Sequence, residues 1–162
     1  MSTPSVQTKN LRLLLQTRAA VRARIAQLAP PEKTEVSASW LALLEGSSAA
    51  DPWIHGFLLE HQTTGAPVGE CAFKGPPGAD GMVEIAYFVA PEHQGKGYAT
   101  EAVAALVSYA FSTGQVCRVM AHTRPEPSAS TRVLTKCGFR RIGEVIDPED
   151  GLVWRWVRRQ EL

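Results

Sequence analysis

The sequence of 162 residues has only three cysteines, no surplus of either charge and no long hydrophobic run. Cys71, Cys117 and Cys137 lie far apart and form no C-x-x-C pair, so they suggest neither a disulfide framework nor a zinc site. The 17 basic and 16 acidic residues nearly cancel, which leaves no basic field for nucleic acid or anionic lipid. No apolar run approaches the roughly 18 residues needed to span a membrane, and residues 1–10 lack the apolar core of a signal peptide. We therefore expect a cytoplasmic protein with reduced thiols and no nucleic acid, membrane or metal partner.

The sequence does have the composition of a compact globular domain. Hydrophobic residues make up 44% and charged residues 20%, which is ordinary for a chain that buries a core. No repeat, low-complexity block or long Pro/Gly-rich linker divides it, so residues 1–162 are expected to form a single domain.

Four segments have the spacing of apolar residues that is typical of helices. They are Arg18–Leu28, Lys33–Glu45, Gly97–Phe111 and Ser128–Lys136. Pro30-Pro31 ends the first helix and Gly138 ends the last. Many apolar residues of the third helix are alanines, which would let it lie close against a sheet. Together with the strands, these helices predict an α+β fold.

The strands are expected to form one sheet. A short strand at Leu11–Leu15 comes first, and segments with a period of two follow at Trp53–Glu60, Val68–Phe73, Met82–Val89, Val116–His122, Phe139–Ile146 and Leu152–Arg158. The three strands between residues 53 and 89 should form an antiparallel meander, and the last two a closing hairpin. The helix after Met82–Val89 should be a crossover that makes the next strand its parallel neighbour. Ligands gather where parallel strands end and helices begin, so attention falls on Val89 to Ala99.

A glycine-rich segment, Gln94-Gly-Lys-Gly-Tyr-Ala-Thr100, lies where that strand stops and the long helix starts. Unpaired N–H groups and the helix dipole favour an anion at a helix N-terminus, and Gly95 and Gly97 allow the backbone to approach it closely. Lys96 adds a mobile cation. The segment therefore favours a phosphate or diphosphate, although the same glycines would also serve a simple tight turn between strand and helix.

Two nucleotide-binding motifs fit this segment poorly. A Walker A loop needs G-x-x-x-x-G-K-S/T, but Gly97 follows Gly95-Lys96. A dinucleotide loop needs G-x-G-x-x-G, and Thr100 occupies its last position. A protein that binds ATP through this loop is thus an unfavoured alternative.

The segment resembles the signature of the GNAT superfamily of N-acetyltransferases. Gln94-x-x-Gly97-x-Ala99 is similar to the family's Q/R-x-x-G-x-G/A pattern, and it follows a strand of the right kind. Downstream, Ala129-Ser-Thr-Arg-Val-Leu-Thr-Lys-Cys-Gly-Phe139 resembles the family's second helix and the start of its next strand. The most similar branch is the RimJ/RimL type. The resemblance covers roughly Leu11 to Arg158 and implies a mixed, mostly antiparallel twisted sheet of about six to seven strands flanked by helices, with two central parallel strands that diverge.

The resemblance also implies acetyl-CoA as cosubstrate, with no metal. Its diphosphate would rest on the N–H groups from Gln94 or Gly95 to Thr100, and its pantetheine arm would pair with the main chain of Phe88 and Val89. The residues implied for coenzyme binding are Phe88, Val89, Gln94, Gly95, Lys96, Gly97, Tyr98, Ala99, Thr100 and Ser130.

Glu84 is the candidate base that removes a proton from the acceptor amine. On a strand it shares a face with Ala86 and Phe88, which would shield its carboxyl partly from water. A carboxylate here resembles the base of the RimJ/RimL-type branch, which often acts through water. A solvated salt bridge or a role in orienting substrate are the alternatives. Tyr87 points to the opposite face and is expected in the core or a pocket wall.

The remaining groups of a transfer site are less sharply defined. The N–H of Val89 is the candidate oxyanion donor if a bulge leaves it unpaired. Ser130 would contact the coenzyme sulfur or pantetheine, or else only satisfy the first turn of its helix. Pro127 and Ser128 replace an asparagine that many relatives use, and Leu134 stands where other branches have a tyrosine acid, so the thiolate would leave unassisted or through Ser130 and water.

His122 ends a strand that leads into this region and is more often a structural residue than a substrate contact. The leading hypothesis is acetyl transfer to a primary amine, either a small molecule or a protein N-terminus. The alternative is a CoA-binding sensor or interaction module without turnover, which the two missing family residues favour. The sequence does not identify the acceptor. Dimers are common in this branch, so a homodimer is compatible with the resemblance.

Overall fold

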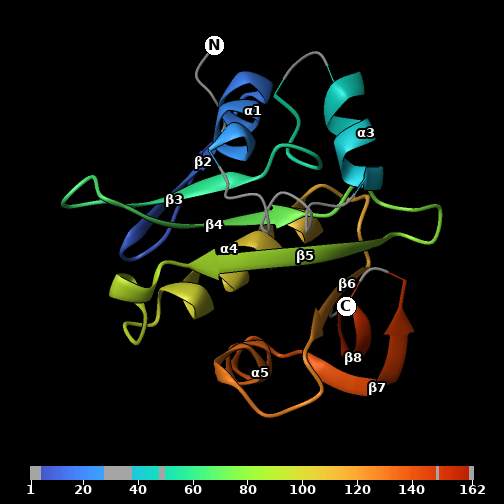
Figure 1. Ribbon diagram of the computed structural model, residues 1–162. Helices are drawn as coiled ribbons and strands as arrows, with labels where there is room; N and C mark the ends of the chain where they lie inside the picture. Colours follow the sequence, from blue (N-terminus) through green and yellow to red (C-terminus); the bar gives the residue numbers. More distant parts are fainter. Residues whose placement is uncertain (1–4, 28–37, 48–49, 149, 161–162) are drawn as a thin grey trace.

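The computed structural model describes residues 5–27, 38–47, 50–148 and 150–160. Eight strands form one sheet in the order β1-β2-β3-β4-β5-β6-β8-β7, with helices on both of its faces (Figure 1). The strands are β1 (Ser5–Gln7), β2 (Leu11–Leu15), β3 (Phe57–His61), β4 (Pro67–Phe73), β5 (Met82–Val89), β6 (Arg118–Thr123), β7 (Arg140–Asp147) and β8 (Gly151–Arg159). The helices are α1 (Arg18–Ala26), α3 (Ala38–Gly46), α4 (Tyr98–Ser112), α5 (Ala129–Lys136) and the short 3₁₀ turn η1 (Pro91–His93).

The α+β class is confirmed, and the sheet has one strand more than expected. Only β5 and β6 are parallel, and every other neighbouring pair is antiparallel. The additional strand is β1, a three-residue edge strand that pairs with β2. The meander of β3, β4 and β5 and the hairpin of β7 and β8 follow the prediction.

The predicted start of the strand at Trp53 differs from the structure. Trp53–Gly56 is a turn rather than the start of a strand, because the carbonyl of Asp51 accepts hydrogen bonds from the N–H groups of Ile54 and His55 at 3.0 and 2.8 Å. The Asp51 carboxylate also accepts from the N–H of Trp53 at 2.9 Å. The predicted helix end at Leu28, the stop at Pro30-Pro31 and the helix start at Lys33 lie outside the described residues.

The core fills one face of the sheet. Inward residues alternate along the strands, as a period of two requires, and α4 covers them with the buried residues Ala102, Val103, Leu106, Val107 and Ala110. Helices α1 and α3 lie on the opposite side of the sheet (Figure 1). There, Arg24 of α1 forms an ion pair with Glu70 of β4. No helix within the described ranges combines the length and apolar character needed to cross a membrane.

The parallel strands diverge, as the resemblance implied. The register of β5 with β6 runs from Met82↔Arg118 to Glu84↔Met120 and stops there. Beyond Glu84, β5 stays paired with β4 as far as Val89, and β6 stays paired with β8 as far as Thr123. The second half of β5 therefore has main-chain groups on one side that face a gap instead of a neighbouring strand.

Candidate active site

A cleft of ≈ 560 Å³ opens where β5 ends and α4 begins. It is bounded by β5, by the loop that leads into α4 and by one side of α5. Its lining residues are Tyr87, Phe88, Val89, His93, Gln94, Gly95, Gly97, Tyr98, Ala99, Thr100, Ala129, Ser130, Arg132, Val133 and Lys136. Every residue expected to bind coenzyme is among them except Lys96, which is exposed.

The loop before α4 is held in a conformation that requires glycine. Gly95 and Gly97 have φ values of 78° and 84°, in the left-handed region. A Cβ added at either position would meet no atom within 4 Å, so the space beside the backbone is open. Gly97 is the N-cap of α4 and no side chain caps it. The loop thus leaves room for an anion directly over the helix start.

The main-chain N–H groups of this loop are mostly unused by the protein. The N–H of Gln94 donates to the carbonyl of Pro91 at 3.3 Å, so it is not among the N–H groups that are free to bind a diphosphate. Across the described chain, the hydrogen bonds outside regular helices and strands use none of the N–H groups of residues 95–100. The N–H of Glu101 is the next to bond, to the carbonyl of Gly97 at 3.1 Å. The six successive main-chain N–H groups of residues 95–100, which we call the N–H cradle, therefore remain for a ligand at the start of the helix.

Gln94 has a structural contact that the sequence did not indicate. Its side-chain amide donates to the carbonyl of Val89 at 2.9 Å. This bond ties the loop to the end of β5 and fixes the distance between the N–H cradle and the gap. The side-chain amide of Gln94 therefore stabilises the loop, although the residue also lines the cleft.

The main chain of Val89 faces the gap, but that of Phe88 does not. The N–H of Lys74 bonds to the carbonyl of Glu84 at 2.8 Å, and the N–H of Ala90 bonds to the carbonyl of Val68 at 2.8 Å. Because main-chain direction alternates along a strand, Phe88 also points toward β4, and Tyr87 and Val89 point away from it. The expected pairing of a ligand with the main chain of Phe88 is corrected to Tyr87 and Val89.

Close packing of β4 on β5 keeps this geometry. A Cβ at Gly69 would collide with the carbonyl of Phe88 and lie 2.9 Å from Cα of Val89. The register from Gly69↔Val89 to Phe73↔Ile85 has no shift. The sequence-based prediction that a bulge leaves the N–H of Val89 unpaired is therefore wrong. This N–H is free because β6 diverges from β5 before reaching it.

Tyr87 and Ser130 form the wall of the cleft between β5 and α5. The Tyr87 hydroxyl donates to the carbonyl of Ser130 at 3.2 Å. Burial raises the pKa of Tyr87 to about 12, so the phenol keeps its proton. The Ser130 side chain is exposed to the cleft. Ser128 caps α5 through a reciprocal pair of hydrogen bonds with Thr131, at 3.3 and 2.9 Å.

Glu84 lies on the other face of the sheet from this wall, and its carboxylate is paired. Oε2 accepts from His122 Nδ1 at 2.8 Å and lies 3.1 Å from Lys74 Nζ. His122 Nε2 in turn accepts from Arg155 Nε at 3.0 Å. The Glu84 side chain is 19% exposed and that of His122 is 5% exposed. The sequence singled out Glu84 and His122 separately and did not indicate Lys74 or Arg155.

The charge on Lys74 is stabilised at this place. Burial lowers its pKa, but attraction to Glu84, the hydrogen bond to that carboxylate, and the more distant Asp150 and Asp147 outweigh burial and leave the pKa raised. Lys74 therefore remains an ammonium beside Glu84 across the physiological range.

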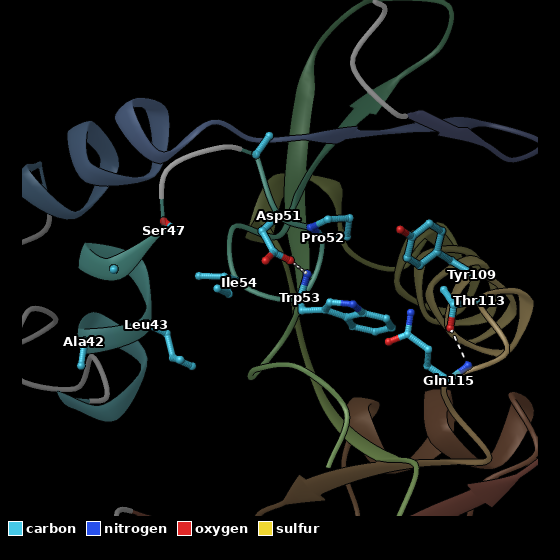
Figure 2. Close-up of a pocket in the computed structure, with 12 residues that line it drawn as sticks. Ala42, Leu43, Ser47, Asp51, Pro52, Trp53, Ile54, Tyr109, Thr113 and Gln115 are labelled. Carbon is cyan, nitrogen blue, oxygen red and sulfur yellow. Dashed lines mark hydrogen bonds between the residues drawn. The ribbon is translucent and has the colours of Figure 1, made fainter. Parts of the chain in front are cut away.

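A second cavity, of ≈ 730 Å³, lies at the far end of α4 (Figure 2). Trp53, Tyr109 and Gln115 border it on one side and Leu43 and Ile54 on the other. Asp51 and the C-terminal turn of α4, which ends at Thr113, also line it, and no basic residue is among its lining residues. A carboxylate and the negative end of a helix dipole oppose a phosphate. Although larger, this cavity is electrostatically unsuited to a coenzyme diphosphate.

Two diverging parallel strands with a glycine-rich helix start beside the gap define the architecture of the acetyltransferases that the sequence resembled. Residues 8–140 match the family model described as an acetyltransferase (GNAT) domain. The chain belongs to the GNAT family.

Several named proteins are similar to this chain. An uncharacterized N-acetyltransferase, p20 of Bacillus licheniformis, is 34% identical over 93 residues, which are 57% of this chain and 52% of that protein. The uncharacterized N-acetyltransferase YjdG of Bacillus subtilis is 32% identical over 94 residues, 58% of this chain and 54% of its own length. The chain thus spans about half the length of the curated relatives it matches. A spermidine N(1)-acetyltransferase of Vibrio cholerae is 28% identical over 64 residues, 40% of this chain and 37% of that enzyme.

Solved structures share the fold along nearly the whole chain. RimL, the ribosomal L7/L12 alpha-N-protein acetyltransferase in complex with coenzyme A, has a TM-score of 0.71 at 18% identity and covers 96% of this chain and 98% of its own. AAC(6')-Ib in complex with paromomycin and acetyl-CoA has a TM-score of 0.65 at 20% identity, and the match covers 94% of each chain. At these identities the likeness establishes the fold alone.

Proposed function

We propose that this protein transfers the acetyl group of acetyl-CoA directly to a primary amine, with Glu84 as the base. The observation that carries this proposal is the row of six unused N–H groups from Gly95 to Thr100, set beside the gap at the end of β5. Family membership and the coenzyme complexes of the structural neighbours support acetyl-CoA as the cosubstrate. The negative diphosphate suits the positive end of α4.

The remaining coenzyme contacts follow from the direction of the main chain. The N–H of Val89 and the main-chain groups of Tyr87 face the gap, where a pantetheine arm would lie like an added strand. The carbonyl of Val89 already accepts from the side chain of Gln94. Tyr98, Ala99 and Thr100 carry three of the N–H groups of the cradle. Ser130 lies on the wall of the same cleft, where it would contact the pantetheine or the sulfur.

The chemistry requires a proton acceptor on the amine side. The acceptor ammonium loses a proton to the Glu84 carboxylate, directly or through water, and its nitrogen then attacks the thioester carbonyl. The attack forms the C–N bond and a tetrahedral intermediate with an oxyanion. As this intermediate collapses, the nitrogen gives up its second proton, the C–S bond breaks and the thiolate takes up a proton. The N–H of Val89 is placed to stabilise the oxyanion. Leu134 is fully buried and, as a leucine, has no hydroxyl to act as an acid, so Ser130 or water would supply the last proton.

The acceptor is a primary amine on a small molecule or at a protein N-terminus. The cation Lys74 lies beside Glu84, Arg155 contacts the far nitrogen of His122, and the whole chain has a net charge of only +1. Like charge near the base disfavours strongly polycationic acceptors. A compact amine with few further positive charges fits this site better.

Some broader properties remain part of the same proposal. We place the protein in the RimJ/RimL-type branch on the strength of its sequence motifs and the RimL fold. We also propose one domain over residues 1–162, a cytoplasmic location and, as in many members of this branch, a homodimer.

The direct test is release of free thiol from acetyl-CoA with a panel of amines. We expect amine-dependent release by the wild type and a fall of at least about 100-fold in Glu84→Gln, because a general base contributes roughly that much or more. Glu60→Gln is the matched control, since Glu60 is also a strand carboxylate in an ion pair, with Arg12 at 3.2 Å, but lies on β3. It should keep its rate within about twofold.

The same experiment separates catalysis from the sensor alternative. Coenzyme A at about 100 times its dissociation constant adds roughly 2.7 kcal/mol to the free energy of unfolding, so it should raise the melting temperature of all three proteins. Thermal stabilisation by CoA without amine-dependent thiol release by the wild type on any amine would favour a sensor and contradict the proposed catalysis.

A further inference from the structure

A chain of four polar side chains crosses three strands on the face of the sheet that carries Glu84. Arg155 of β8 donates to His122 of β6, His122 contacts Glu84 of β5, and Glu84 pairs with Lys74 next to β4. His122 and Arg155 are directly opposite one another in the β6–β8 register. The contact joins Glu84, the last residue of β5 that pairs with β6, to His122, which lies two residues past its partner Met120, where the gap begins.

The hydrogen bonds determine where the proton of the imidazole lies. The Nε–H of Arg155 can only donate, so Nε2 of His122 must accept. A neutral ring then carries its proton on Nδ1 and donates it to Oε2 of Glu84 at 2.8 Å. If Nε2 carried the proton instead, two N–H donors would face one another. Of the two neutral tautomers, Arg155 thus selects the one with its proton on Nδ1.

Both partners of Glu84 use the same carboxylate oxygen. His122 and Lys74 both make their shortest contact with Oε2, and no hydrogen bond among the described residues uses Oε1. A carboxylate held at one oxygen cannot rotate freely, so the direction of the other oxygen is fixed as well. Oε1 is then the atom that faces an acceptor ammonium or its bridging water.

We infer that His122 and Arg155 are positioning residues that hold Glu84 by one oxygen so that the other can accept the proton of the acceptor amine. This inference rests on the proposed function of Glu84. Neither His122 nor Arg155 touches the reacting atoms. His122 supplies one neutral N–H donor, and Arg155 keeps that donor on the correct nitrogen.

Two substitutions at His122 separate positioning from simple packing. Asparagine places its amide N–H near the position of Nδ1 and keeps the donor to Glu84, whereas glutamine reaches the position of Nε2 and keeps only the contact with Arg155. We expect His122→Gln to lower kcat about tenfold, the effect of roughly one hydrogen bond to a charged group. His122→Asn should recover kcat to within about threefold of the wild type.

Two further readouts belong to this test. KM for acetyl-CoA and the thermal shift with CoA should stay unchanged in both variants, because His122 is not among the residues that line the coenzyme cleft. The ring nitrogens of ¹⁵N-labelled His122 should show the Nδ1–H form in the wild type, and Arg155→Ala should abolish that preference.

The results that would overturn the inference are distinct from a failure of the proposed function. The inference fails if the wild type transfers acetyl groups but His122→Gln keeps kcat within about twofold, or if asparagine and glutamine lower kcat equally. It also fails if the ring of the wild type carries its proton on Nε2. If the wild type transfers nothing, the proposed function fails, and the role of His122 and Arg155 as positioning residues fails with it.

Discussion

Gly97 begins α4 with a backbone conformation that other residues rarely adopt. Its φ of 84° lies in the left-handed region, and the space beside its Cα is open. An alanine here costs roughly 1–2 kcal/mol, which the loop can avoid only by turning its N–H groups away from the cleft. We expect Gly97→Ala to weaken CoA binding at least about tenfold, equivalent to 1.4 kcal/mol, as measured by calorimetric titration.

Gly114 provides the control for that substitution. It also has a left-handed φ, 74°, with no atom within 4 Å of an added Cβ, but it follows the C-terminal end of α4. Gly114→Ala should destabilise the protein about as much as Gly97→Ala and leave CoA affinity unchanged. Equal losses of affinity in both variants would contradict a specific role for the loop before α4.

For individual residues, the sequence predicted which of them lie near the cleft more accurately than it predicted their side-chain contacts. Glycine spacing and the strand-to-helix change were enough to place Gln94 to Thr100, because backbone conformation is a local property. Side-chain direction is not local. Gln94 turned back to Val89, Lys96 turned to solvent, and Lys74 and Arg155 reached Glu84 and His122 from strands that only the sheet brings together.

At the scale of elements, α4 is tied to the turn between β1 and β2 by Glu101. Its carboxylate accepts from the side chain of Thr8, from the N–H of Asn10 at 2.5 Å and from the Asn10 amide at 3.1 Å. Burial raises the pKa of Glu101, but these hydrogen bonds outweigh burial and leave the pKa lowered from its usual 4.5. The contacts hold the first turn of α4, and with it the N–H cradle, against the edge of the sheet.

A lowered carboxylate pKa gives a definite pH dependence. Because the folded protein binds this proton more weakly than the unfolded chain, the contribution to stability is present above about pH 4.5 and is lost as pH falls through the folded pKa. We expect Glu101→Gln to lower the free energy of unfolding by about 1 kcal/mol at pH 7. The difference from the wild type should shrink as pH falls below 4.5, as measured by urea unfolding.

Glu92 serves as the control for Glu101. It is exposed on η1, and the described residues give its side chain no hydrogen bond or ion pair. Glu92→Gln should follow the wild type at every pH. If the difference in the free energy of unfolding between the wild type and Glu101→Gln stays the same down to acid pH, lost packing and not the charged hydrogen bonds is responsible.

Element boundaries were predictable where one local signal dominated. The range Met82–Val89 agrees with β5, since a clear period of two runs between a glycine turn and a proline. β1 was missed, because three residues carry too little pattern and the strand depends on pairing with β2. The turn at Trp53–Gly56 was also missed, because the Asp51 contacts that form it are not visible in the period of apolar residues.

At the scale of the whole molecule, the site depends on where the parallel strands separate. The sequence predicted two parallel neighbours from one crossover, but the residue at which they part was not deducible from it. The structure places that point after Glu84. Glu84 and His122 therefore meet on one face at the closed end of the gap, while Tyr87, Val89 and the cradle line its open end.

Charge distinguishes the cavities at the two ends of α4. One lies at the N-terminal end of α4 and the other at its C-terminal end. The helix dipole gives them opposite polarity, and only the first suits a diphosphate. The proposed function therefore requires that the coenzyme bind at the N-terminal end of α4.

A titration of ¹⁵N-labelled protein with coenzyme A, followed through the main-chain amide signals, tests this most directly. We expect the largest changes at Gly95 to Thr100, with Val89 close behind and little change at Trp53 or Tyr109. Amide signals at residues 95–100 that stay still while those around Trp53 and Tyr109 move would contradict the account.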